Sequence, residues 1–265
     1  MLAALAAAAV VVYLQGRGDD RADERRAAIT SYIAGVNMAQ QELAVELVAV
    51  NDAYRDLRLE AAALPEQIER LDEAESTLSS LRSRVAQLAP PPDARRLQRE
   101  LLALLDLQVG FAGEVEALAR YLLVEVDERR EVASATKSLR TGLTGAETAD
   151  AQNAAFVRYA RALDAAAVTL EEATAPPVLE PSRTGEIARL ERLVALSKQL
   201  GASLTGPDAR RVDELFRRFA QTTADTGTTK AERDAVIAFN RRLRAIADRR
   251  AAVTQERARL DRVVR

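Results

Sequence analysis

The sequence lacks several residue types on which common protein chemistries depend. Its 265 residues include no Cys, no His and no Trp. Without Cys, neither a disulfide framework nor a thiolate metal site can form, and without His no imidazole can act as a base or a metal ligand. The absence of Cys does not distinguish between an oxidising and a reducing compartment. An all-carboxylate cation site is still conceivable, although no acidic cluster has the spacing of an EF-hand loop.

Common catalytic and nucleotide-binding motifs are also absent from the sequence. The chain contains no Walker A string, no G-x-G-x-x-G and no G-x-S-x-G. Adjacent acids such as Glu171 and Glu172 point in different directions around a helix, so they do not form a carboxylate pair. We therefore expect a protein that is not an enzyme, with no cofactor and no metal.

Aromatic residues are scarce, at 4%, and the apolar residues, 48% in all, are dominated by Ala, Leu and Val. Ala, Leu, Arg, Glu and Gln lose little rotamer freedom on a helix, whereas clusters of β-branched residues bounded by turns are nearly absent. The composition predicts an all-α fold. We expect an elongated antiparallel helical hairpin or coiled coil, followed by a smaller helical bundle.

The first fourteen residues, MLAALAAAAVVVYL, carry no charge. A helix of that length spans roughly 21 Å, which is less than the ~30 Å hydrocarbon core of a bilayer. No Lys or Arg precedes the run and no A-x-A site follows it, so a cleaved signal peptide is disfavoured. We interpret residues 1–16 as a membrane anchor, either whole or the end of a longer one. The alternatives are a cleaved signal and the end of a soluble helix.

The flanking sequence RGDDRADERR holds four basic and four acidic residues, so the distribution of positive charge does not settle the orientation. A single N-terminal anchor commonly exports the chain that follows it. We therefore expect a membrane-anchored protein with most of its chain outside the cytoplasm.

The strongest pattern is a series of aliphatic residues spaced by seven. It predicts a packing seam with the coiled-coil period of 3.5 residues, in which a helix winds around a partner. We place the companion seam positions four residues further on, beginning with Ile33, Gln40 and Leu47. The seam consists of Ile29, Val36, Leu43, Val50, Leu57, Leu64, Leu71, Leu78 and Val85.

Two proline-containing stretches interrupt the helical pattern. Pro65 follows Leu64 without changing the heptad phase, which favours one kinked helix over two helices that meet at a corner. The sequence APPPD at 89–93 ends the helix, and Asp93 can cap the next one. A short turn between long helices predicts an antiparallel hairpin. Its second seam contains Leu97, Leu104, Phe111 and Leu118, with the polar Gln108 between them.

We divide the chain at the glycines of RTGLTGAETAD, because Gly142 and Gly145 can end a helix. The expected parts are the anchor at 1–16, a hairpin at 20–143 with its turn at 89–93, and a C-terminal helical bundle at 146–265. The heptad pattern predicts how the helices pack and does not point to a catalytic activity.

Residues 229–265 form the basic part of the chain, with eleven Lys and Arg against five Asp and Glu. A basic amphipathic helix can bind anionic lipid or nucleic acid, but interleaved acids and a single aromatic favour a helix that packs in a bundle. Arg250 and Arg257 stand at seam positions, where an unpaired charge is costly to bury. We expect them to mark the place where this helix extends beyond its neighbours into solvent or a partner.

These features favour a membrane-tethered, extracytoplasmic structural or interaction module, with a protein partner or a second copy bound through helical seams. The alternative is a soluble or inner-face coiled-coil adaptor that binds anionic lipid or nucleic acid through its basic C-terminal helix. Nucleic acid is the less expected partner.

Overall fold

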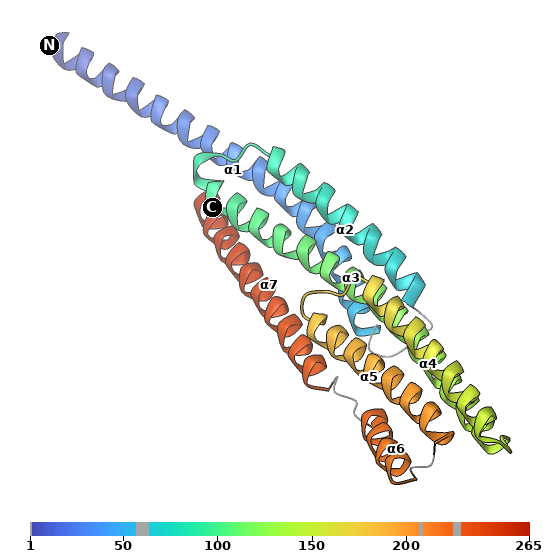
Figure 1. Ribbon diagram of the computed structural model, residues 1–265. Coiled ribbons are helices and arrows are strands. Elements are labelled where there is room, and N and C mark those ends of the chain that lie inside the picture. The colour runs from blue at the N-terminus through green and yellow to red at the C-terminus, as the bar shows by residue number, and fades with distance from the viewer. Residues whose placement is uncertain (1, 57–63, 207–208, 225–228) are drawn as a thin grey trace. The chain divides into compact units, whose positions relative to one another are not determined.

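The structure is a computed structural model that describes residues 2–56, 64–206, 209–224 and 229–265. Within these ranges, side chains are described for 22–55, 64–206, 210–224 and 233–265. Across this part of the chain the fold is all-α, as the composition predicts, with no strands. Figure 1 labels the helices along the chain.

The described residues form seven α-helices and one short 3-10 turn. No helix among them is long and apolar enough to cross a membrane, and the side chains of residues 1–21, where we expect the anchor, lie outside the description. The helices are α1 (Leu2–Asp56), α2 (Leu64–Gln87), η2 (Pro92–Ala94), α3 (Arg95–Thr144), α4 (Ala149–Glu172), α5 (Glu180–Leu204), α6 (Ala209–Ala224) and α7 (Thr229–Val264).

The chain forms two compact units. Unit 1 comprises residues 1–53, 70–113 and 242–265, and unit 2 comprises residues 54–69 and 114–241. This division differs from the expected one, because the boundaries fall inside α3 and α7 rather than at the glycines near 142–145. A continuous helix of 50 residues, such as α3, can supply one half to each unit.

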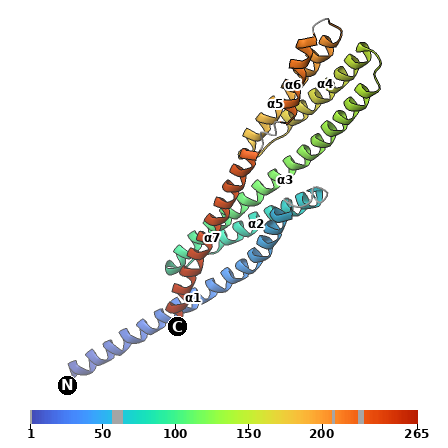
Figure 2. The ribbon, with the colours of Figure 1, turned by 90° about the horizontal axis from the view of Figure 1, so that it is seen from below.

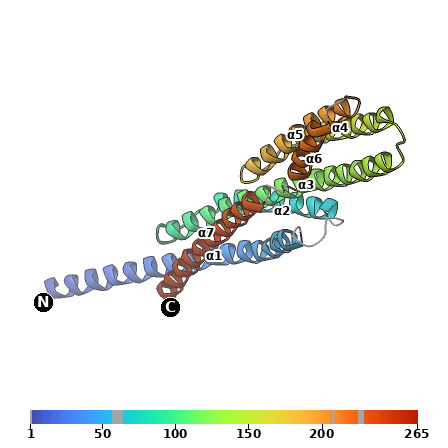
Figure 3. The same ribbon diagram turned by 60° about the horizontal axis from the view of Figure 1, so that its bottom comes forward.

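Unit 1 contains the heptad seam. Its core is made by one face from each of α1, α2, α3 and α7, and Figures 1 and 3 show α7 alongside α1 and α3. Leu57 lies outside the described residues, and Leu64 belongs to unit 2, where it is also buried. In unit 1 the buried seam residues are Ile29, Val36, Leu43, Val50, Leu71, Leu78, Val85, Leu97, Leu104 and Phe111.

The companion positions differ from the expected ones. The structure buries most of the described residues three positions after a seam residue, as in a regular a/d heptad, and several are alanines: Tyr32, Ala39, Ala53, Ala74 and Leu81. Glu46 and Leu88, at the same spacing, are only half-buried. Of the expected positions four residues on, Ile33 and Leu47 are only half-buried, whereas Ile68 in unit 2 is buried. Alanine gives little hydrophobic signal in a sequence, but its small side chain lets neighbouring backbones approach.

Ion pairs join the helices of unit 1 at several levels. Asp93 in η2 accepts two hydrogen bonds from the Arg25 guanidinium of α1, at 2.5 and 2.6 Å. The Asp93 carbonyl oxygen also accepts a hydrogen bond from Arg259 of α7, at 2.7 Å. Asp93 therefore links the end of α7 to α1, and in Figure 1 the C-terminus lies beside this turn.

The predicted break at residues 89–93 is present, since α2 ends at Gln87 and α3 begins at Arg95 after the 3-10 turn. The Gln98 side chain closes the break by donating to the carbonyl oxygens of Val85 and Leu88. Near Pro65 the chain forms two helices, α1 ending at Asp56 and α2 beginning at Leu64, so the favoured single kinked helix is not what is observed. The segment between them, 57–63, lies outside the described residues.

Unit 2 packs the second half of α3 against α4, α5 and α6 (Figure 2). Phe156 and Leu163 of α4 and Leu190 of α5 are among its fully buried side chains. Gly142 lies within α3 and does not end it. A Cβ at this position would lie 3.1 Å from the Cβ of Ala155, so the glycine permits α3 and α4 to approach closely. Leu118, the last predicted seam residue, is half-buried in this unit.

Candidate functional site

Unit 1 has a surface groove along α7. Two cavities, of about 390 and 580 Å³, share the lining residues Leu47, Arg250 and Thr254 and so form one continuous depression. We call it the α7 groove. Its walls come from α1 and α7, and its floor comes from α3. Along α7 it extends from Leu243 to Asp261, which is about 27 Å at the helical rise per residue.

The smaller cavity is the polar end of the groove. It is lined by Gln40 of α1, Gln108 of α3, and Arg257 and Asp261 of α7. The carboxamide of Gln108 is buried, with the residue 1% exposed, and neither its nitrogen nor its oxygen has a hydrogen-bond partner in the described part of the chain. An unsatisfied buried amide costs about 1–3 kcal/mol, so a group that bonds to it would be bound favourably.

The two arginines that stand at seam positions both line this groove. Arg257 is half-buried and donates from Nη1 to Oε1 of Gln40, at 2.8 Å. Arg250 is exposed where the two cavities meet. Within the described residues, neither guanidinium forms an ion pair with a carboxylate. The lining residues of the polar end therefore include two cations and one acid, Asp261.

Other arginines of α7 behave differently. Arg249 donates to Glu100 of α3, at 2.5 Å. Glu256 is 6% exposed and pairs both with Arg96 of α3, at 3.0 Å, and with Arg259, at 2.8 Å. The Arg249–Glu100 and Arg96–Glu256 pairs hold α7 against α3, and Arg259 contacts η2, whereas Arg250 and Arg257 remain available to an anion. Arg257 does not lie beyond the neighbouring helices, because it contacts Gln40 of α1, whereas Arg250 is exposed to solvent as expected.

The larger cavity is the apolar end. Its lining includes Leu47, Phe111, Leu243, Ile246 and two alanines of α7, Ala247 and Ala251. Phe111 and Ile246 are buried, and Ala247 and Ala251 are exposed on the rim. Polar side chains, including Arg250, Thr254 and Gln255, also line this cavity. The two ends differ in that Gln108 and Arg257 lie only at the first, and Phe111 and Ile246 only at the second.

Unit 2 contains a second feature, a buried acid on α3. Glu128 is 3% exposed, and neither carboxylate oxygen has a hydrogen-bond partner among the described residues. The pKa of Glu128 is raised to about 7, chiefly by burial and to a smaller extent by the nearby Glu186, while Arg189 and Arg129 oppose the rise. This side chain therefore titrates near neutral pH, a property that the sequence pattern does not predict.

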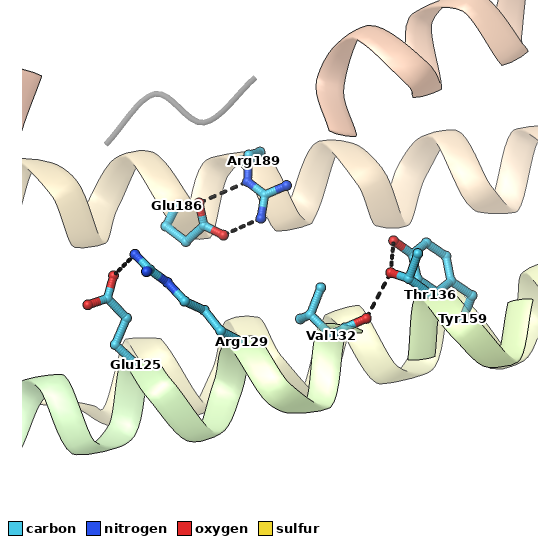
Figure 4. A network of polar contacts seen from close by, with 7 residues as sticks. All are labelled: Glu125, Arg129, Val132, Thr136, Tyr159, Glu186 and Arg189. Carbon is cyan, nitrogen blue, oxygen red and sulfur yellow. Dashed lines mark hydrogen bonds and ion pairs between the residues drawn. The ribbon is translucent and has the colours of Figure 1, made fainter. Parts of the chain in front are cut away.

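The charges that act on Glu128 belong to two ion pairs on facing helices, and Figure 4 shows these two pairs. Arg189 of α5 pairs with Glu186, and Arg129 of α3 pairs with Glu125 at 2.7 Å. Because both arginines are already paired, their charges stabilise an ionised Glu128 only partly. The sequence gives no signal for this site, since the burial of Tyr121, seven residues before Glu128, is known only from the structure.

The outer face of α1 carries large apolar side chains exposed to solvent. Met38, Val45 and Val48 are 66%, 68% and 61% exposed. With Gln41 they follow the spacing 38, 41, 45 and 48, which is a second a/d stripe on the helix. We call these four residues the outer stripe. Clustered exposed apolar side chains often mark an interaction surface.

Comparisons with protein-family models, with curated proteins and with solved structures found no match to this chain. The functions of these sites are therefore inferred from their geometry and chemistry.

Proposed function

We propose that the chain is a membrane-tethered helical interaction module without a catalytic role, and that its first partner is a second copy of the same chain. The observation that carries the proposal is the outer stripe of α1. The buried seam of α1 packs within unit 1, whereas the stripe offers a further heptad surface. The tether itself is supported by the uncharged residues 1–14.

The tether favours self-association for a geometric reason. Two copies anchored by the same end hold their α1 helices parallel, so identical stripes lie at the same height above the bilayer. The stripe is only about two heptads long, and so short a coiled coil is weak in solution. Confinement to one membrane raises the effective concentration of the partner and compensates for this weakness.

The absence of Cys allows a direct test. Val45→Cys places a single thiol on the outer stripe, and mild oxidation in membranes should give a disulfide-linked dimer. Ser80→Cys, at an exposed position on α2, is the matched control and should remain monomeric. Adding Val48→Glu to the Val45→Cys chain should reduce the dimer several-fold, because two like charges would face each other. Equal cross-linking of both cysteines, or of neither, would refute self-association through the stripe.

The Val45→Cys variant also tests the membrane tether and the side of the membrane on which unit 1 lies. We expect the protein to stay in the membrane fraction after carbonate extraction. We also expect a membrane-impermeant maleimide to label Val45→Cys in intact cells. Release by carbonate would contradict the anchor, and labelling only after lysis would place unit 1 on the inner face.

The competing proposal is a basic adaptor that binds an anionic surface through residues 229–265. Two of its arginines, Arg249 and Arg259, are engaged with Glu100 of α3, with Glu256 and with the Asp93 carbonyl of η2, which reduces the charge available to a partner. Strong, salt-sensitive binding of the full chain to vesicles containing phosphatidylserine, or to DNA, would favour this adaptor instead.

A further inference from the structure

We propose that the α7 groove binds a single-chain amphiphile with an anionic head group. The head group, a carboxylate or a phosphate, lies at the polar end between Arg250 and Arg257, and the aliphatic chain lies along the apolar end. This inference goes beyond the proposed self-association, because the groove and the outer stripe are formed by different residues.

The charge of the head group follows from the two arginines. Arg257 uses one of its N–H groups on Gln40 and keeps the other donors for a ligand. Arg250 and Arg257 are seven residues apart, about 10 Å along the helix axis, a span that their long side chains can close on one anion. Asp261, the one acid among the described residues that line the groove, lies beyond Arg257 and away from the apolar end.

Gln108 provides an independent indication of a ligand. Its amide is almost completely buried and has no hydrogen-bond partner within the described chain, although it lines the same cavity as the two arginines. A buried amide normally finds a partner. A head-group oxygen can accept a hydrogen bond from its nitrogen, which satisfies a donor that the described chain leaves unpaired.

The apolar end of the groove is suited to bind the hydrocarbon tail of the amphiphile. Its volume, about 580 Å³, lies in the range of pockets that enclose small ligands. Leu47, Phe111 and Ile246 present aliphatic or aromatic surface there. A simple anion would leave this surface open to water, and an uncharged hydrocarbon would leave the guanidinium groups without a counter-charge. Only a molecule with both parts uses the whole groove.

Photo-cross-linking of the full chain tests this assignment. The probes are a dodecanoic acid that carries a diazirine near the end of its chain, the corresponding alkyl phosphate, and the corresponding alkylamine, each below its micellar concentration. We expect the two anionic probes to label peptides that contain Phe111 or residues 243–251, and the amine to label them at least about tenfold less. Competition with unlabelled dodecanoate and dodecyl phosphate then identifies the preferred head group.

Variants separate the groove from other surfaces. Arg250→Gln with Arg257→Gln should reduce anionic labelling at least about tenfold, whereas Arg262→Gln, at an exposed position on the same helix, should leave it unchanged. Ala247→Trp fills the apolar end from its exposed rim and should abolish labelling by every probe while circular dichroism shows an intact fold. Gln108→Leu should reduce anionic labelling several-fold and yet raise the unfolding temperature, a combination that a purely structural role would not produce.

Three results would overturn the proposal. One is labelling spread over the surface, another is equal labelling by the amine, and the third is labelling that persists in the double arginine variant. Inorganic phosphate that competes as strongly as dodecyl phosphate would reduce the groove to a simple anion site and refute the amphiphile. None of these results bears on disulfide formation at Val45→Cys, so the two proposals fail independently.

Discussion

Glu128→Gln replaces a buried acid with a neutral side chain of nearly the same shape, and its effect should depend on pH. The pKa of Glu128 is about 7 in the folded protein, against an ordinary value of 4.5. Between these two values the folded chain holds a proton that the unfolded chain has already released. The contribution of protonated Glu128 to the free energy of unfolding is therefore complete below about pH 4.5 and is lost as the pH rises through 7.

The magnitude follows from the size of the shift. Each pKa unit corresponds to about 1.4 kcal/mol, so a rise from 4.5 to about 7 corresponds to about 3 kcal/mol. Near pH 4.5 the free energies of unfolding of the wild type and Glu128→Gln should be similar. At pH 8 the variant should be more stable by up to about 3 kcal/mol, because it removes the cost of an ionised carboxylate in a buried setting.

Urea denaturation followed by circular dichroism at pH 4.5, 6, 7 and 8 measures this difference. Hydrogen exchange in peptides that cover Glu128 shows whether the effect is local to unit 2. Glu131→Gln, at an exposed position on the same helix, is the control for the change from Glu to Gln. A constant difference between Glu128→Gln and the wild type across this range would show that Glu128 is hydrated in solution, and the reasoning from burial would be wrong.

Further substitutions test the packing of unit 1, each measured by urea or thermal unfolding. Leu78→Ala should cost about 2–5 kcal/mol, since Leu78 is 0% exposed and its loss leaves a cavity; a cost below about 1 kcal/mol would contradict the buried seam. Gly110→Ala should stabilise the protein by about 0.5–1 kcal/mol, because Gly110 lies inside α3 with open space where a Cβ would be. Gly113→Ala, on the same helix, should gain less, because its Cβ would lie 3.1 Å from an oxygen of Glu75; equal gains would refute this contact.

The sequence predicted the helical class and one line of the core, because large aliphatic residues that recur every seven positions fall on one face of a helix and need a partner there. It did not predict the companion line. Ile33 and Leu47 are more apolar than Tyr32 and Ala39, yet the structure buries Tyr32 and Ala39. Burial on a helix depends on which neighbours can approach, and an alanine allows an approach that hydrophobicity alone does not reveal.

The candidate site was predicted only in part, for a related reason. Arg250 and Arg257 were conspicuous because they interrupt an apolar seam, but their setting depends on how α7 lies against α1 and α3. That arrangement is long-range, and no local pattern encodes it. The boundaries between the two units were not predicted for the same reason. They fall inside long helices such as α3, whose sequence does not show where one set of neighbouring helices ends and another begins.

Three polar residues, Gln108, Glu128 and Glu256, are buried on long helices and differ in their partners. Glu256 is buried with two arginines around it, so its charge is compensated and its role is to join α7 to α3. Gln108 and Glu128 are buried as deeply, without hydrogen-bond partners in the described chain. Leucine at either position would avoid the cost of desolvation, so packing alone does not account for them. The polar groups that the fold leaves unsatisfied are therefore better indicators of binding and of pH response than the ion pairs that it completes.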